Sequence, residues 1–197
     1  MIVIQYPYRT LFIFLPVLLF AACSQDYSPK PRGYMRIELP QRDYIRFDLD
    51  YPYSFEHANY SVMEPDTRAT AEDYWADIYY PQFRARIHMS YKTVENTEQL
   101  QGHFNDARTF VTRHIPKASA IRDEMIVNEK ANVYGVLYQI RGREAATALQ
   151  FYATDSLRHF LRGALYFNVR TNNDSLSPVI EHIEEDIRHL FSTLEWE

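Results

Sequence analysis

Three side chains near the C-terminus have the types and spacing of a metal site. His182, Asp186 and His189 recur at steps of four and three residues, which places them on one face of a helix. Imidazole and carboxylate groups are common zinc ligands. The same face also carries Glu185 and Arg188, as the solvated side of an amphipathic helix does. We therefore interpret this face as solvent-exposed and predict no metal site.

A second group has the residue types of a hydrolase. Asp155, Ser156 and His159 lie within five residues, but no glycines flank Ser156 in the manner of a nucleophile elbow. Short polar side chains favour a turn between strands, which explains Asp155 and Ser156 without catalysis. We predict a non-enzymatic protein with no catalytic residues.

The glycines and the net charge exclude further classes. The chain has five glycines, and no two of them have the spacing of a phosphate-binding or dinucleotide-binding loop. The formal net charge is −5, which argues against nonspecific nucleic-acid binding. The sequence therefore predicts no cofactor, no nucleotide and no nucleic-acid partner.

Cys23 is the only cysteine, and its position indicates covalent lipid attachment. It follows a basic start at Arg9, an apolar run over residues 11–22 and the small pair Ala21-Ala22, which together are typical of a secretory signal peptide. Residues 20–23 resemble a bacterial lipobox, in which the cysteine is acylated after cleavage. We predict a signal peptide at residues 1–22, a lipidated tether at residues 23–33 and a single globular domain at residues 34–197.

Residues 148–169 predict a long central hairpin. Leu161, Gly163 and Leu165 alternate with Arg162 and Tyr166, which gives one apolar face and one mixed aromatic face. The alternation begins earlier, and residues 154–156 supply the turn.

The other elements require such a sheet to pack against. A stripe at steps of three and four predicts a helix over residues 96–114, with Asn96 as its cap and Pro116 beyond its end. Ser177 as cap and Pro178 at the first position predict a second helix. Alternation predicts strands over residues 74–80, 83–91, 120–128 and 133–141, a two-residue turn at Gly142-Arg143, and a loop over residues 64–73.

This order predicts an α+β fold, an antiparallel β-sheet with two main amphipathic helices packed on it. It is similar to the α/β/α sandwich of Mog1 and PsbP.

Arginine and tyrosine side chains define a candidate interaction surface. Arg84 and Arg86 share one side of their strand, and Arg162 and Tyr166 lie on the mixed face of the central hairpin. Both residue types are favoured at protein interfaces.

A likeness to a known family is carried by residues 29–34, 36–37, 83–91, 133–135, 150–152, 160–168, 174–180, 185–187 and 194–196. It covers nearly the whole mature chain and includes Cys23. On these residues the chain resembles the gliding motility lipoproteins of GldD type from the Bacteroidetes.

The resemblance implies a lipid-anchored cell-envelope component of the gliding machinery, associated with type IX secretion. Its partners would be other lipoproteins and membrane proteins of that machinery, and its anchor would be acylated Cys23 on a membrane, facing the periplasm. Two alternatives stay open, a small-ligand-binding periplasmic lipoprotein and an envelope hydrolase. The first would have a deep apolar pocket with a few polar groups, and the second a cleft with a perturbed acid or base.

Overall fold

The structure is a computed structural model that describes residues 37–47, 49–169 and 172–197. The chain divides into two units, Met1–Met35 and Arg36–Glu197, and the described residues all belong to the second. The predicted signal peptide, the tether and Cys23 lie outside the described residues.

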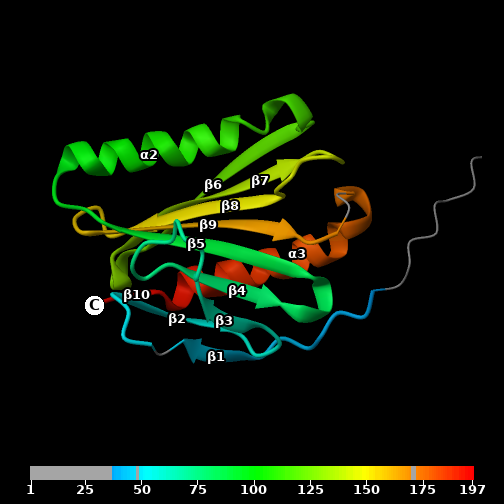
Figure 1. Cartoon of the computed structure of the whole chain (residues 1–197), viewed down its shortest axis with the longest axis horizontal. Coiled ribbons are helices and arrows are strands. Elements are labelled where there is room, and N and C mark those ends of the chain that lie inside the picture. Colours follow the sequence, from blue (N-terminus) through cyan, green and yellow to red (C-terminus); the bar gives the residue numbers. More distant parts are fainter. Residues whose placement is uncertain (1–36, 48, 170–171) are drawn as a thin grey trace, which may run out of the picture. The chain divides into compact units, whose positions relative to one another are not determined.

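The second unit is built on a seven-stranded antiparallel sheet, in the order β3-β4-β5-β9-β8-β7-β6 (Figure 1). Its strands are β3 (Val62–Pro65), β4 (Ala76–Tyr80), β5 (Ala85–Thr93), β6 (Ala120–Asn128), β7 (Val133–Arg141), β8 (Leu149–Thr154) and β9 (His159–Phe167). Short 3₁₀ helices follow three of the elements: η1 (Pro81–Phe83), η2 (Ile115–Lys117) and η3 (Glu129–Ala131).

The predicted central hairpin is confirmed as β8 and β9. In its turn, one carboxylate oxygen of Asp155 accepts hydrogen bonds from the backbone N–H groups of Leu157, Arg158 and His159. Ser156 adopts a left-handed backbone with φ of 66°. The predicted turn role of Asp155 and Ser156 is therefore confirmed.

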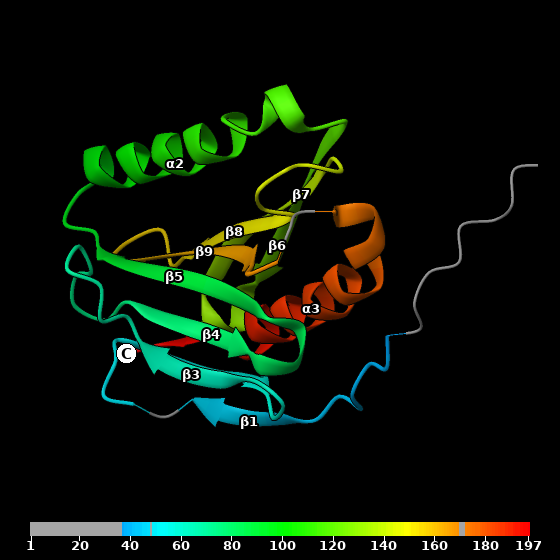
Figure 2. The same cartoon turned by 45° about the vertical axis from the view of Figure 1, so that its right-hand side comes forward.

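Two helices cover opposite faces of the sheet, α2 (Thr97–Thr112) and α3 (Asn173–Thr193) (Figure 2). Because side chains alternate along β9, Phe160 packs against α2 and Leu161 belongs to the core under α3. Asn96 caps α2 as predicted, since its side chain accepts a hydrogen bond from the Gln99 N–H. The α+β prediction of an antiparallel sheet with two packed helices is confirmed.

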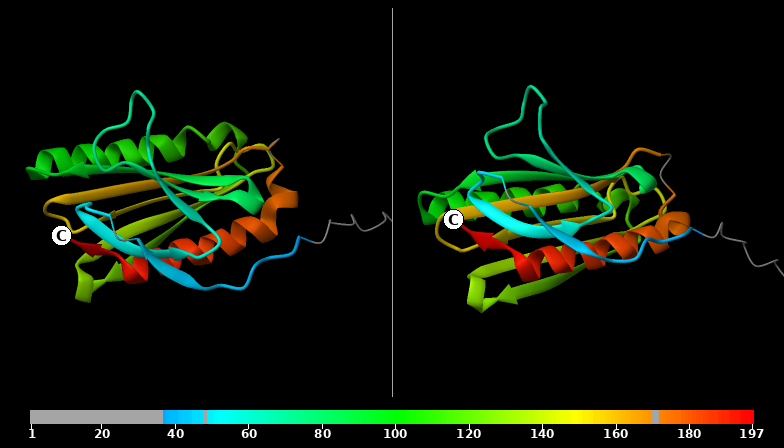
Figure 3. Two further views of the ribbon diagram at one scale, coloured as in Figure 1. Left: turned by 60° about the horizontal axis from the view of Figure 1, so that its bottom comes forward. Right: turned by 90° about the horizontal axis from the view of Figure 1, so that it is seen from below.

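A second, three-stranded sheet lies beside α3 on the same face of the large sheet (Figure 3). It consists of β1 (Tyr44–Phe47), β2 (Tyr53–Ala58) and β10 (Glu195–Trp196), in the order β1-β2-β10. The Tyr53 ring on β2 lies 5.5 Å from the Tyr91 ring on β5, which joins the two sheets through one core. Both views in Figure 3 show that the loop between β3 and β4 projects from the domain.

Several predicted boundaries are wrong: β4 begins at Ala76 and β5 at Ala85, each two residues after its predicted start. The helix α3 begins at Asn173 and contains Pro178, so Ser177 is not its cap. Ser177 instead donates a hydrogen bond to Glu181. No two-residue turn forms at Gly142-Arg143, because β7 ends at Arg141 and β8 begins only at Leu149. Gly142 is required for another reason: a Cβ there would overlap the Lys117 carbonyl oxygen.

Two glycines allow the α3 side of the sheet to close. A Cβ on Gly163 would overlap the Phe151 ring, and a Cβ on Gly135 would overlap the Phe191 ring. The Phe151 and Phe191 rings are themselves in edge contact, 5.5 Å apart. The aromatic core under α3 can therefore pack only because Gly135 and Gly163 have no side chains.

We expect Gly163→Ala to destabilise the protein by about 1–3 kcal/mol, because the added methyl overpacks a buried aromatic site. The matched control is Gly102→Ala on α2, where a Cβ would meet no atom within 4 Å. That change should stabilise by about 0.5–1 kcal/mol through helix propensity. Urea unfolding of both variants measures the difference, and equal effects at the two positions would contradict the packing argument.

Candidate functional site

Two of the four predicted interaction residues, Arg162 and Tyr166, line a groove between α2 and the large sheet. The groove has a volume of about 510 Å³. Strands β5 and β9 form its floor, because Ser90 pairs with Arg162 and Arg86 pairs with Tyr166 in their register. The volume falls in the range of small-molecule binding sites.

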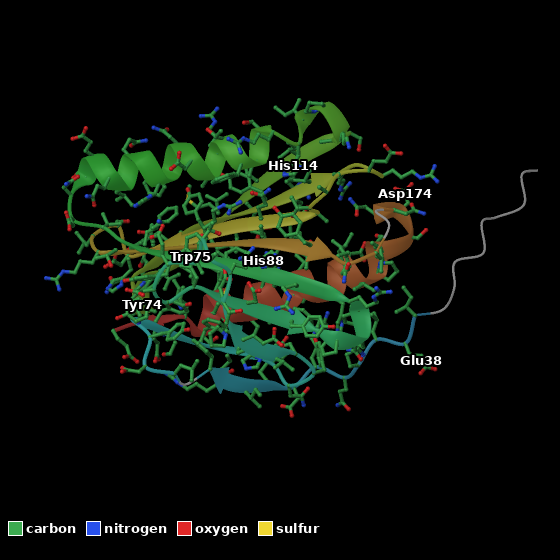
Figure 4. All side chains as sticks on the ribbon, in the orientation of Figure 1. Glu38, Tyr74, Trp75, His88, His114 and Asp174 are labelled. Atoms are coloured by element: carbon green, nitrogen blue, oxygen red, sulfur yellow. The ribbon has the colours of Figure 1, made fainter. Side chains whose placement is uncertain are left out.

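Aromatic rings form much of the wall of this groove. They come from the loop before β4, from α2 and from β9: Trp75, Phe110, Phe160 and Tyr166. Figure 4 labels Trp75, in the loop before β4, and His88 on β5, and both line the groove. Flat apolar surfaces of this kind bind the body of a ligand, and polar groups fix its orientation.

Arg162 is half-buried in the groove and points toward α2. Its guanidinium carbon lies 4.2 Å from the centroid of the Phe110 ring, a cation–π contact. Its Nη2 donates a hydrogen bond of 3.0 Å to Gln150 Oε1. Burial lowers the pKa of the Arg162 guanidinium, although arginine stays charged at neutral pH.

The other two formal cations that line the groove have carboxylate partners. Arg68 pairs with Asp66, and Lys92 pairs with Glu72 while its ammonium lies 5.5 Å from the Trp75 ring centroid. His88 also has a partner, since its Nδ1 lies 2.7 Å from Asp77.

The remaining two predicted residues lie outside the groove lining. Arg86 sits beside it and donates to Glu64 Oε2 at 2.6 Å and to Asp77 Oδ2 at 3.0 Å. Arg84 is exposed at the turn before β5, with a left-handed φ of 50°. The structure therefore brings Arg86, Arg162 and Tyr166 onto one sheet face and leaves Arg84 at its end. Their role in binding stays a prediction.

The interpretation of the His182 and Asp186 face as solvated is wrong. Asp186 is only 3% exposed, because the small sheet covers this side of α3. Tyr60 donates a hydrogen bond of 2.7 Å to Asp186 Oδ2, and Tyr44 donates one of 3.2 Å to Oδ1. Burial raises the pKa of the Asp186 carboxyl, and burial next to Asp186 raises the pKa of Tyr44 to about 12.

The three residues that had metal-ligand spacing do not converge. His182 Nε2 lies 3.0 Å from the Tyr60 hydroxyl, whereas His189 Nε2 lies 2.7 Å from Glu56 on β2. In the part of the chain that the structure describes, no group of three or more His, Cys, Asp or Glu side chains is arranged to hold a metal ion. Asp186 with Tyr44 and Tyr60, called here the Asp186 cluster, instead joins the small sheet to α3.

An exposed apolar patch on β6 and β7 was not predicted. Met125 is 76% exposed, and Val127 and Tyr134 are also exposed. Val127 pairs with Tyr134 in the β6–β7 register, so both lie on the α2 face. Within the described residues β6 is an edge strand of the sheet. The signal was present in the sequence, because three consecutive apolar residues on a strand, 125–127, must place apolar side chains on both faces.

We expect Asp186→Ala to destabilise the protein by about 2–3 kcal/mol, because it leaves buried hydroxyl donors without their acceptor. The matched control is Glu185→Ala, one residue away on the solvent side, which should change stability by less than about 0.5 kcal/mol. Urea unfolding at pH 7.5 compares the two, and an equal loss in both would show that Asp186 does not hold the sheets together.

Histidine burial predicts that stability falls on mild acidification. Burial lowers the pKa of five histidines: His57, His103, His114, His159 and His182. Unfolding therefore takes up protons below pH 6.5, the ordinary pKa of histidine. The stability that the neutral, buried histidines contribute is complete above pH 6.5, and it is lost as the pH falls through their lowered pKa values in the folded protein. The raised pKa of Asp186 has the opposite effect on stability. Its contribution is lost as the pH rises from 3.8, the ordinary value, through the higher pKa of the carboxyl in the folded protein.

We expect a smaller free energy of unfolding at pH 5.5 than at pH 7.5, measured by urea titration. In His57→Gln the difference between the two pH values should shrink, because one buried imidazole is removed. Equal stability at both pH values, or greater stability at pH 5.5, would contradict the assignment.

Within the described residues, no helix is long and apolar enough to cross a membrane. A search of solved structures finds cyanobacterial PsbP (CyanoP) from Synechocystis sp. PCC 6803, in a solution structure with a TM-score of 0.46 and 11% identity. The match covers 83% of this chain and 98% of that one. No curated protein matches the chain.

The comparison with protein families gives a match over nearly all of the chain beyond Cys23. The family described as gliding motility lipoprotein GldD matches residues 24–196. The span includes the groove, the Asp186 cluster and the β6–β7 patch. The resemblance stated from the residues alone is thereby confirmed, and the chain belongs to the GldD family of gliding motility lipoproteins.

Proposed function

We propose that this protein is a non-enzymatic component of the gliding machinery of a bacterium of the Bacteroidetes phylum, associated with type IX secretion. Acylated Cys23 anchors it in the cell envelope with its folded part facing the periplasm, and it acts through contacts with other proteins of the machinery. The observation that carries the proposal is the family match, which begins at residue 24, directly after Cys23.

Lipid attachment at Cys23 provides the membrane anchor in this proposal. Each buried methylene of an acyl chain contributes about 0.8 kcal/mol, so a multiply acylated cysteine holds the protein firmly. A tether of about ten residues follows at 23–33, and two prolines near its end give it stiffness.

The β6–β7 patch supports action through protein contacts. Exposed edge strands offer unpaired backbone groups, and exposed apolar side chains beside them add area that a partner can bury. Met125 and Val127 supply these side chains on the edge strand, and Tyr134 extends the patch onto β7. A partner strand added to β6 would cover both features.

The groove favours a second candidate function, that of a small-ligand-binding periplasmic lipoprotein. It combines aromatic walls with the Arg162 guanidinium in a volume of about 510 Å³. For a hydrolase no comparable observation exists among the described residues, because the Asp155 carboxylate is occupied by three backbone N–H groups.

Affinity purification of the full chain from its own cell envelope tests the proposal. The unaltered protein should recover gliding and secretion components, and Cys23→Ala should lose or reduce that recovery. The pair Met125→Glu and Val127→Glu should reduce it at least about tenfold, because both place charge on an apolar contact.

The matched control is Leu157→Glu, in the β8–β9 turn, where the side chain is 74% exposed. Its recovery of partners should equal that of the unaltered protein. Loss of partners in Leu157→Glu but not in the β6 variants would exclude the β6–β7 patch. A protein recovered alone, with a retained small molecule, would favour the ligand-binding function instead.

A further inference from the structure

The Arg162 guanidinium has no carboxylate partner among the described residues. None of the ion pairs found among the described residues involves Arg162, and its hydrogen bond there goes to the neutral Gln150 amide. A half-buried charge without a counter-charge is costly, since burial removes water without returning an ion pair. Arg68 and Lys92 in the same groove differ from Arg162, because each of them forms an ion pair with a carboxylate.

The charge of Arg162 also acts on a neighbouring group. His114, just beyond α2 (Figure 4), has a lowered pKa, first because it is buried and second because Arg162 repels its protonated form. The charge of Arg162 is therefore felt at His114, just beyond the end of α2.

A second donor without a partner lies beside Arg162. Gln150 is 2% exposed, and while its Oε1 accepts from Arg162, its Nε2 has no acceptor in the described part of the chain. A buried amide donor normally finds a partner, and leaving it without one costs about 1–3 kcal/mol. The guanidinium and the amide are thus adjacent donors with no acceptor that would satisfy both.

We propose that the groove between α2 and strands β5 and β9 binds a small organic anion, a carboxylate carried on a flat apolar body. The carboxylate pairs with Arg162, whose planar fork suits two-oxygen acceptors. The body lies among the rings of Trp75, Phe110 and Tyr166. The cation–π contact with Phe110 holds the guanidinium in place before the ligand binds.

This inference deepens the second candidate function, ligand binding in the groove, by naming the chemistry of the ligand. It does not rest on the proposed role in the gliding machinery, because the groove and the β6–β7 patch involve different residues. A carboxylate is favoured over a cation because Arg68 and Lys92 are already paired with carboxylates, whereas Arg162 is the lining arginine without such a partner among the described residues. An apolar body is favoured because a bare anion would leave the aromatic walls uncovered.

The test is calorimetric titration of the full chain in lipid nanodiscs, with protein-free nanodiscs as the blank. The probes are 2-naphthoate and its neutral counterpart 2-naphthalenemethanol, which share one flat body and differ in charge. We expect naphthoate to bind at least about tenfold more tightly, the effect of one charge-assisted pair. Equal affinity for the two probes would overturn the proposal, and this comparison needs no variant.

Variants then locate the site. Arg162→Met should reduce naphthoate affinity at least about tenfold and leave 2-naphthalenemethanol binding nearly unchanged. The matched control is Arg143→Met, which removes an exposed arginine between β7 and β8, outside the groove, and should leave both affinities unchanged. Equal losses in the two variants would show general charge attraction and overturn the site.

A peptide arm separates a free ligand from a protein segment. A short peptide with a C-terminal phenylalanine is titrated with its carboxylate free and with it amidated. Binding of the free-carboxylate peptide without binding of naphthoate would overturn the small-ligand site. Binding of naphthoate with a dependence on Arg162 supports it, whichever partners the β6–β7 patch recovers.

Discussion

The close contact between the central strands and α3 is the constraint on which the domain depends. Gly135 on β7 and Gly163 on β9 flank β8, and their missing side chains leave room for the rings of Phe191 and Phe151. These rings meet edge to face, so the helix rests on the sheet at the glycines. With α3 held there, its opposite side faces the small sheet, and Asp186 reaches the hydroxyls of β1 and of the β2–β3 loop. One tight contact therefore sets the position of two sheets.

Alternation along β9 transmits this constraint to the other face. Because Leu161 and Gly163 must face α3, Arg162 must face α2, where the described residues supply no carboxylate for it. A protein that needed only stability would favour an apolar residue there, since a buried unpaired charge costs free energy. The cation–π contact with Phe110 offsets part of that cost. Keeping a charge at this position is the physical reason to look for an anion in the groove.

Sequence patterns predicted those elements whose boundaries depend on neighbouring residues. They failed where a segment distant in the sequence determines the burial of a face or the start of a helix. Strands 120–128 and 133–141 have the predicted bounds, because alternation and turn residues specify them without reference to the rest of the chain. The face of His182 and Asp186 was predicted to be solvated, because the helix sequence contains no signal that β1 and β2 cover it. Pro178 likewise marked a plausible first turn, yet the helix extends one turn further back, where Asn173 bonds to the Gly142 and Ala145 carbonyls. Those contacts span about thirty residues of sequence and have no periodic signature.

The first described residues lie on a different side of the large sheet from the proposed binding surfaces. They run along the α3 side, where Arg42 lies 4.0 Å from Asp186 and Tyr44 donates to the same carboxylate. The groove and the β6–β7 patch both lie on the α2 side of the large sheet. Arg42 and Tyr44, at the start of the described domain, therefore lie away from both proposed binding surfaces. An anchored protein can present both surfaces at once, and since they use different strands of one sheet, a ligand at β5 and β9 leaves the β6 edge free for a partner.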